Sequence, residues 1–441
     1  MSEIKIEIIS RNCIKPSTPT PPYLETFRLS LLDQLSPNIH GNSTFFYPYN
    51  STNDPISEFS TRSKLLRKSL SETLTRFYPL AGRLQDASTI GCNDDGAFFI
   101  EARTDSPLSD ILGSPDFNRI QHLLPTSDKE TVEISNGSML LVQFTLFGCG
   151  GTTVTISLTH KIADIAAFIA LIQSWTAACR GVAEVAVPEL DIGGSLFPQR
   201  EILGMSASVH IAAEKFKARR FIFSEFKVGE LRSRIISALG KEAEFKPSRV
   251  EVVLALIWRC AISSSRSKTG SFKPSALFQA VNLRPRMDPP VPDSALGNFV
   301  WPFAVMAEEE GDLELQELVK KMRKSMKEFL EKKVNKFKGD GFGAVMEALK
   351  ERGELFKKNK DILVYKCSSW CKFALLEFDF GWGNNVWMTS VNNLVSNTIA
   401  LMDTQDGGVE VLVTLDEQEM DIFEQHQELL QYALRNPSII I

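Results

Sequence analysis

The stretch 154–165, VTISLTHKIADI, decides the fold predicted for this chain. From Val154 to Leu158, apolar residues alternate with threonine and serine, which predicts a half-buried β-strand. The preceding run 141–147, LVQFTLF, predicts a second strand, and the turn residues GCGG at 148–151 join the two as a hairpin. From Ile165 onward, apolar residues recur at i, i+3, i+4 and i+7, which predicts an amphipathic helix directly after the strand.

The same two periodicities recur on both sides of this stretch. Helical spacing covers 66–77, 252–258 and 315–330, and strand alternation covers 409–415. Two of the helices begin with capping patterns, Ser248 with Glu251 and Asp416 with Glu419. Residues 183–212 carry scattered proline and glycine without clear periodicity, and they predict a long connection between two halves. Because helices and strands mix throughout both halves, the fold class is α/β or α+β.

Composition excludes several functional classes. The 441 residues suffice for two or three domains, and 49 basic against 54 acidic residues leave a net charge of −5. That balance argues against a nucleic-acid binder that depends on phosphate contacts. The seven cysteines show no C-x-x-C spacing, so we expect neither a disulfide framework nor a metal site. The charged N-terminus and the lack of a membrane-length apolar run predict a cytoplasmic protein.

His160 is the main candidate for chemistry. It follows an alternating strand and precedes an apolar helix, and strand-to-helix junctions often expose reactive side chains. An imidazole with an unperturbed pKa of about 6.5 suits proton abstraction near neutral pH. A histidine that only packs beside the hairpin is an equally good interpretation. Asp164, four residues on, either orients the imidazole or caps the following helix, and spacing alone does not decide between these roles.

Two further clusters carry candidate residues. The stretch 376–383, LEFDFGWG, contains the Asp-Phe-Gly of protein kinases, but the glycine-rich loop and the His-Arg-Asp loop of kinases are absent. Gly381 and Gly383 on either side of Trp382 predict a tight backbone that holds a large ring. The proline-rich loop 282–293 bears Arg284 and Arg286. A structural salt bridge is the alternative interpretation of both clusters.

Together these clusters resemble the plant BAHD acyltransferases. His160 to Asp164 is similar to the H-x-x-x-D motif of that family, and Asp379 to Gly383 resembles its D-F-G-W-G motif. Supporting matches follow in order along nearly the whole chain: YPLAGR at 78–83, Gln143, CGG at 149–151, NLRPR at 282–286, Gly297-Asn298, SSW at 368–370 and VTLDEQEM at 413–420. The ordered set is far more specific than either motif alone.

The resemblance implies an α/β fold of two similar-sized domains related to chloramphenicol acetyltransferase. Each domain is a mixed β-sheet flanked by helices, and a solvent channel runs between them. We expect an N-terminal domain over 1–190 with the H-x-x-x-D motif, a crossover connection over 191–212, and a C-terminal domain over 213–441 with the D-F-G-W-G motif.

The resemblance also implies a role for each site residue. His160 is the general base, whereas Asp164 pairs with Arg284 and is structural. Asp379, Gly381, Trp382 and Gly383 form a structural motif that shapes the coenzyme A side. The Ser368 hydroxyl and the Trp370 indole are expected to support the developing oxyanion. Lys246, Ser248 and Arg249 at a helix N-terminus are candidates for a coenzyme A phosphate, and a plain capping box is the alternative.

One departure concerns the second motif. The family usually continues D-F-G-W-G with a basic residue and proline, whereas Asn384 and Asn385 follow here. This difference is expected to reshape the loop on the coenzyme A side.

The function implied is an acyl-CoA-dependent O-acyltransferase, with acetyl-CoA as co-substrate and no permanently bound cofactor. The segments 14–22, IKPSTPTPP, and 32–35, LDQL, resemble the clade that acetylates alkaloid or terpenoid alcohols. We expect a monomer that binds neither nucleic acid nor membrane. Two alternatives are a condensation-type enzyme that uses a carrier protein and a non-catalytic binding homologue. Condensation-type enzymes usually carry a second histidine before the catalytic one, where this chain has Thr159.

Overall fold

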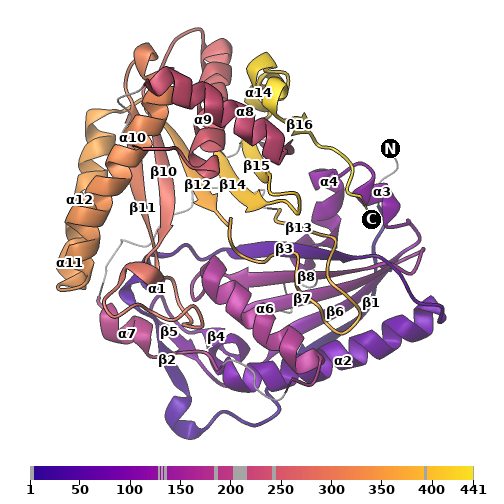
Figure 1. Cartoon of the computed structure of the whole chain (residues 1–441). Helices are drawn as coiled ribbons and strands as arrows, with labels where there is room; N and C mark the ends of the chain where they lie inside the picture. The colour runs from indigo at the N-terminus through magenta and orange to yellow at the C-terminus, as the bar shows by residue number, and fades with distance from the viewer. Residues whose placement is uncertain are drawn as a thin grey trace.

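The computed structural model describes residues 4–127, 130, 133, 137–182, 187–201, 216–240, 245–391 and 395–440. The chain forms two halves, each built on a mixed β-sheet flanked by helices, as predicted (Figure 1). The sheet of the N-terminal half has the strand order β1-β6-β7-β8-β3-β13, and that of the C-terminal half β11-β10-β12-β14-β15-β9-β16. A small third sheet, β2-β5-β4, lies beside the first.

The N-terminal half contains eight strands and five helices among its described residues: β1 (Glu7–Ile14), β2 (Thr26–Arg28), α1 (Leu31–Leu35), β3 (His40–Tyr47), α2 (Pro55–Arg76), β4 (Arg83–Leu84), β5 (Thr89–Gly91), β6 (Ala97–Thr104), α3 (Ser109–Leu112), α4 (Phe117–Ile120), β7 (Leu140–Phe147), β8 (Thr152–Thr159) and α6 (Ile165–Cys179). Four short 3₁₀ turns complete it: η1 (Pro22–Leu24), η2 (Tyr78–Ala81), η3 (Gln121–Leu123) and η4 (Pro125–Ser127).

The described part of the C-terminal half follows: α7 (Ile192–Leu196), β9 (Phe216–Phe223), α8 (Glu225–Leu239), α9 (Arg249–Thr269), β10 (Ser275–Asn282), η5 (Arg284–Arg286), β11 (Val300–Ala307), η6 (Glu310–Leu313), α10 (Leu315–Glu328), the π-helical η7 (Phe329–Val334), α11 (Asn335–Phe337), α12 (Gly341–Lys358), β12 (Leu363–Ser369), β13 (Trp387–Thr389), β14 (Thr398–Asp403), β15 (Val409–Asp416), α13 (Glu417–Phe423), α14 (Gln427–Tyr432) and β16 (Leu434–Arg435).

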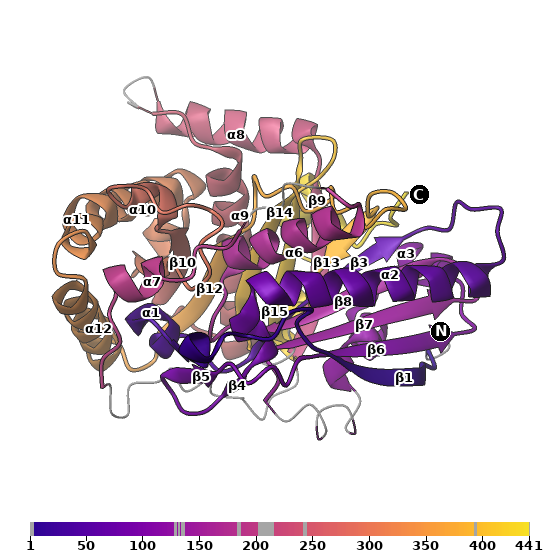
Figure 2. The ribbon, with the colours of Figure 1, turned by 90° about the horizontal axis from the view of Figure 1, so that it is seen from below.

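The hairpin and helix predicted around His160 are confirmed as β7, β8 and α6. The prediction that β8 is half-buried is wrong, because all eight of its residues are buried. Helices α2 and α6 cover one face of this sheet (Figure 2). Met402 and Leu412 of the other half belong to the same hydrophobic core as this sheet. The polar side chains of β8 are therefore buried together with its apolar ones.

The other predicted elements are present as α2, α9, α10 and β15, and Asp416 caps α13. One boundary differs, since the helix expected over 315–330 changes to a π-helical turn at Phe329. Phe329 and Val334 are both buried and lie five residues apart. A π-helical turn places residues at this spacing on one face, so the change keeps both side chains in the core.

The two halves exchange segments. β13, although late in the chain, pairs with β3 and completes the N-terminal sheet. Conversely, Leu31 and Leu32 of α1 pack into the core of the C-terminal half. At the end of the chain, the Ile439 N–H donates to Leu112 O at 2.7 Å. The boundaries 1–190 and 213–441 stay a prediction, and of the predicted crossover 191–212 residues 202–212 lie outside the described residues.

Candidate active site

His160 lies directly after β8, where the chain turns toward α6. Its backbone is held on both sides: the N–H donates to Ile39 O at 2.7 Å, and the carbonyl accepts from Asn298 Nδ2 at 2.9 Å. The imidazole Nδ1 is buried and has no hydrogen-bond partner in the described part of the chain. The main chain of His160 is therefore anchored, while its ring is not committed to a described structural hydrogen bond.

Asp164 begins α6 and accepts hydrogen bonds with both carboxylate oxygens. Oδ1 accepts from the Ala167 N–H at 3.0 Å as a helix cap. Oδ2 accepts from Arg284 Nη1 at 2.7 Å and from the Phe299 N–H at 2.9 Å. None of these contacts goes to the imidazole, so the structure favours the capping and ion-pair role over orientation of His160.

Arg284 is completely buried and joins the two halves at this point. Besides Asp164, its Nη2 donates to Ala295 O at 2.9 Å and to Gly297 O at 3.1 Å. Its guanidinium also lies 4.8 Å from the centre of the Phe299 ring, a cation–π contact. These contacts fix the position of the guanidinium and of the Asp164 carboxylate that pairs with it.

Sequence reasoning missed a buried polar cluster behind His160. Asp33 of α1 accepts at Oδ1 from both the backbone N–H (2.7 Å) and Nδ2 (2.8 Å) of Asn298, and burial raises the pKa of this carboxyl. The neighbouring Lys161 Nζ donates to Gln34 O at 2.6 Å, and burial lowers the pKa of this ammonium. Gly297-Asn298 and the segment 32–35 matched the family pattern, and the capping pattern of Ser30 with Asp33 predicts a helix start. None of these signals predicts a contact between Asp33 and Asn298, 265 residues apart.

The D-F-G-W-G segment forms a tight loop around its aspartate. Asp379 Oδ1 accepts from the N–H groups of Gly381 (2.7 Å) and Gly383 (2.8 Å). Gly381 and Gly383 have positive φ values of +109° and +104°. Residues that carry a Cβ atom disfavour this backbone conformation, whereas glycine adopts it readily. The loop holds the Trp382 ring 5.0 Å from the Arg62 guanidinium and 5.7 Å from the Phe380 ring. These contacts fit a structural motif.

The two asparagines that depart from the family pattern differ in environment. Asn384 is exposed, whereas Asn385 is buried and donates to Leu375 O at 2.9 Å and to Trp387 O at 3.3 Å. Its Oδ1 accepts from the Phe378 N–H at 3.2 Å. Asn385 thus closes the loop with side-chain hydrogen bonds where the family usually has proline.

Ser368 and Trp370 lie at the end of β12 and contact each other. The Trp370 indole N–H donates to Ser368 Oγ at 2.9 Å. An indole has one donor, and Ser368 occupies it in this structure, so oxyanion support from Trp370 stays a prediction. The arrangement instead leaves the Ser368 hydroxyl hydrogen free to donate and lets Trp370 orient it.

The residues predicted to hold a coenzyme A phosphate are largely used by the protein itself. Ser248 forms the capping box of α9 with Glu251, as the alternative interpretation predicted. Arg249 pairs with Asp403 at 2.6 Å and donates to Gly407 O at 2.9 Å. Lys246 is exposed, and its ammonium has no partner among the described side chains. Of the three residues, Lys246 alone keeps a free cation.

Comparison with known proteins assigns the family. The model of the Transferase family matches residues 4–430 of the chain. The chain belongs to the BAHD acyltransferase family. It is 36% identical to epi-neemfruitin B 7-O-acetyltransferase of Melia azedarach over 98% of this chain and 99% of that protein. It is 34% identical to the BAHD acyltransferase BIA1 of Arabidopsis thaliana over 99% of this chain and 100% of that protein.

A solved structure agrees with this assignment. Vinorine synthase of Rauvolfia serpentina matches with a TM-score of 0.83 and 32% identity over 99% of both chains. The family resemblance and the two-domain α/β fold predicted from the sequence are therefore confirmed. The chain is an acyltransferase.

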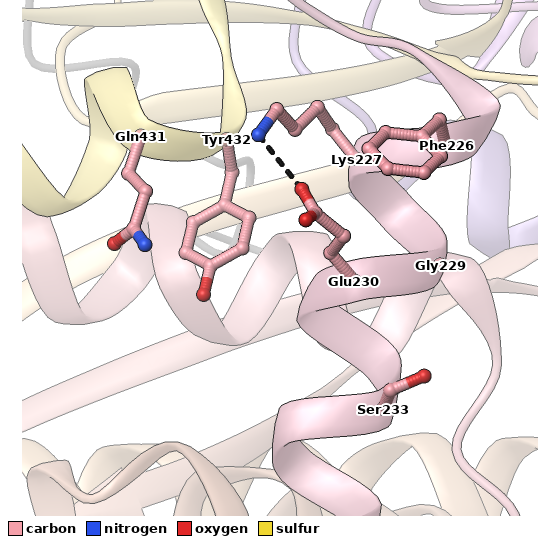
Figure 3. A pocket seen from close by; sticks show the side chains of 7 residues that line it. All are labelled: Phe226, Lys227, Gly229, Glu230, Ser233, Gln431 and Tyr432. Carbon is pink, nitrogen blue, oxygen red and sulfur yellow. Dashed lines mark hydrogen bonds and ion pairs between the residues drawn. The ribbon is translucent and has the colours of Figure 1, made fainter.

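Two surface depressions of this BAHD acyltransferase have linings that do not include His160. One, of about 620 Å³, separates α8 from α14 and contains the ion pair between Lys227 and Glu230 at 2.7 Å (Figure 3). It contains none of the predicted site residues; its lining is Phe226, Lys227, Gly229, Glu230, Ser233, Gln431 and Tyr432. Within the described ranges, no cluster of three or more metal-binding side chains is found. Across the same ranges, no helix combines the length and apolar character needed to cross a membrane.

Proposed function

We propose that this acyltransferase transfers an acetyl group from acetyl-CoA to a hydroxyl of a bulky plant alcohol, an alkaloid or a limonoid-type triterpenoid. The observation that carries the proposal is His160, whose backbone is anchored from both halves while its ring has no described hydrogen-bond partner. The family assignment and relatives named as acetyltransferases of such alcohols support the donor and the acceptor class. We further propose a monomeric cytoplasmic enzyme with a substrate channel between its two halves.

The proposed mechanism is direct transfer. His160 removes the proton of the acceptor hydroxyl, and the oxygen attacks the thioester carbonyl. The tetrahedral intermediate collapses as the carbon–sulfur bond breaks, and the proton held by the imidazole passes to the departing coenzyme A thiolate. No acyl-enzyme intermediate is needed. Asp164 and Arg284 act by holding the turn after β8, not by proton transfer.

Ser368 is proposed to donate to the oxyanion of this intermediate. Replacing Ser368 with alanine is expected to lower kcat by up to about 10²-fold with little change in KM, because one oxyanion donor is lost. Trp370→Phe, which removes only the hydrogen bond that orients Ser368, is expected to have a smaller effect. Steady-state kinetics of both variants tests this order. A Trp370→Phe loss larger than that of Ser368→Ala contradicts it.

Lys246 is proposed to contact a phosphate of coenzyme A. Lys246→Gln is expected to raise KM for acetyl-CoA about two- to fivefold, the magnitude of one exposed ionic contact. The control is the same exchange at Lys320, an exposed lysine already paired with Glu317 at 2.7 Å. If the two variants have equal KM values for acetyl-CoA at the same ionic strength, Lys246 does not contact coenzyme A.

The proposed function is tested by acyl transfer from labelled acetyl-CoA to a panel of alkaloid and triterpenoid alcohols. Acetyl ester formation that depends on His160 supports the proposal. Transfer only from an acyl carrier protein would support the condensation-type alternative. Binding of panel alcohols without transfer from any donor would support a non-catalytic homologue.

A further inference from the structure

We infer that Asn298, held by Asp33, is the positioning residue that fixes His160 for catalysis. The inference rests on the proposed general-base role of His160 and adds to it a device built from both halves of the chain. Asp33 lies in α1 of the N-terminal half, and Asn298 lies just before β11 in the C-terminal half. Both side chains are buried, with exposed fractions of 2%.

The hydrogen bonds of Asn298 account for both amide hydrogens. One Nδ2 hydrogen goes to Asp33 Oδ1 at 2.8 Å, and the other goes to the His160 carbonyl at 2.9 Å. The Asn298 backbone N–H also donates to Asp33 Oδ1, at 2.7 Å. A side-chain amide nitrogen carries two hydrogens in a fixed plane, so the hydrogen bond to Asp33 fixes the direction in which the second hydrogen points. Asp33 thereby aims the remaining donor at the main chain of His160.

Asp33 is itself held in place. Its Oδ2 accepts from the Ser30 hydroxyl at 2.6 Å and from the Ser30 N–H at 3.1 Å, so the carboxylate accepts four hydrogen bonds in all. The backbone of His160 has a second support, because the His160 N–H donates to Ile39 O at 2.7 Å. Contacts from both halves therefore set the position of the histidine backbone. Because misplacement of a reacting group by about 1 Å can cost about 10²-fold in rate, such a support matters for catalysis.

The test compares two substitutions that keep side-chain shape. Asn298→Asp removes the donor to His160 and places a second carboxyl beside Asp33. Asp33→Asn disturbs the bridge but leaves the Asn298 amide able to donate to His160. For Asn298→Asp we expect kcat per folded enzyme to fall about 10²-fold, with KM for acetyl-CoA within about twofold of wild type. For Asp33→Asn we expect a lower melting temperature and a much smaller loss of kcat.

The control is Asn436→Asp. Asn436 Nδ2 donates to Pro115 O, so this asparagine also links the two halves but has no described contact with His160. Its substitution is expected to lower the melting temperature and to leave kcat unchanged. If Asn298→Asp is insoluble, Asn298→Ala, which removes the donor to His160 without adding a charge, takes its place with the same expected split between kcat and KM.

Two results would overturn the inference. The first is a wild-type kcat in the folded Asn298 variant. The second is an equal loss of kcat in the Asp33 and Asn298 variants, in proportion to the stability that each has lost. Either would make the bridge purely structural. An inactive wild type across all donors and acceptors contradicts the proposed function instead, and melting temperatures alone then show only whether the bridge stabilises the fold.

Discussion

Replacing His160 with alanine is expected to lower kcat by about 10²- to 10⁴-fold, the usual contribution of a general base. The fold should survive, because the imidazole makes no hydrogen bond with the described residues and the backbone contacts to Ile39 and Asn298 do not need the ring. The melting temperature is therefore expected to stay close to that of the wild type. The measurement is steady-state acetyl transfer, with circular dichroism on the same preparations.

The matched control for this prediction is His426→Gln. His426 begins α14, and its Nδ1 lies 3.5 Å from Cys260 Sγ, within the C-terminal core region. This variant is expected to keep the wild-type kcat. If His160→Ala transfers acetyl groups at the wild-type rate, His160 is not the base. If both histidine variants lose activity together, the loss reports a general effect on the fold.

Local structure around the site was predictable from the sequence because it depends on neighbouring residues. The hairpin, α6 and the capping box of α9 each follow from side-chain periodicity or from hydroxyl and carboxyl groups three residues apart. The burial of β8 was not predictable, since its polar side chains have partners more than 100 residues away, such as Thr44 for Thr155 and Asn42 for Ser157. Alternating polarity shows which residues share a face but not what later covers it.

At the candidate site, too, the sequence predicted local structure but not the contacts made by distant segments. His160 stood out because it follows a strand and precedes a helix, but the partner of Asp164 came only from the family resemblance. Contacts between distant segments, such as Arg249 with Asp403 and Asn298 with Asp33, have no sequence signal in a single chain. In the structure, Arg249 is engaged by Asp403, and the backbone of His160 is held from both halves. A phosphate contact of Arg249 stays a prediction.

Breaking the buried pair of Asp164 and Arg284 is expected to destabilise the enzyme more than any other single change considered for this site. Asp164→Asn leaves the completely buried guanidinium without a counter-charge, and the loss of one partner of a buried pair costs about 3–5 kcal/mol. At roughly 2–4 °C per kcal/mol, the melting temperature should fall by about 6–20 °C. Activity should fall with the folded fraction, which thermal unfolding and kinetics on the same samples can measure.

A double-substitution cycle gives this prediction its control. Arg284→Met leaves the Asp164 carboxylate unpaired, whereas Asp164→Asn/Arg284→Met removes both charges and is expected to be more stable than the sum of the single losses implies. Glu230→Gln, which breaks the exposed pair with Lys227, should change stability by less than about 0.5 kcal/mol. If Asp164→Asn keeps the wild-type melting temperature yet loses activity, Asp164 takes part in the reaction directly. The ion pair would then not be its main role, and the orientation of His160 by this carboxylate would have to arise in the substrate complex.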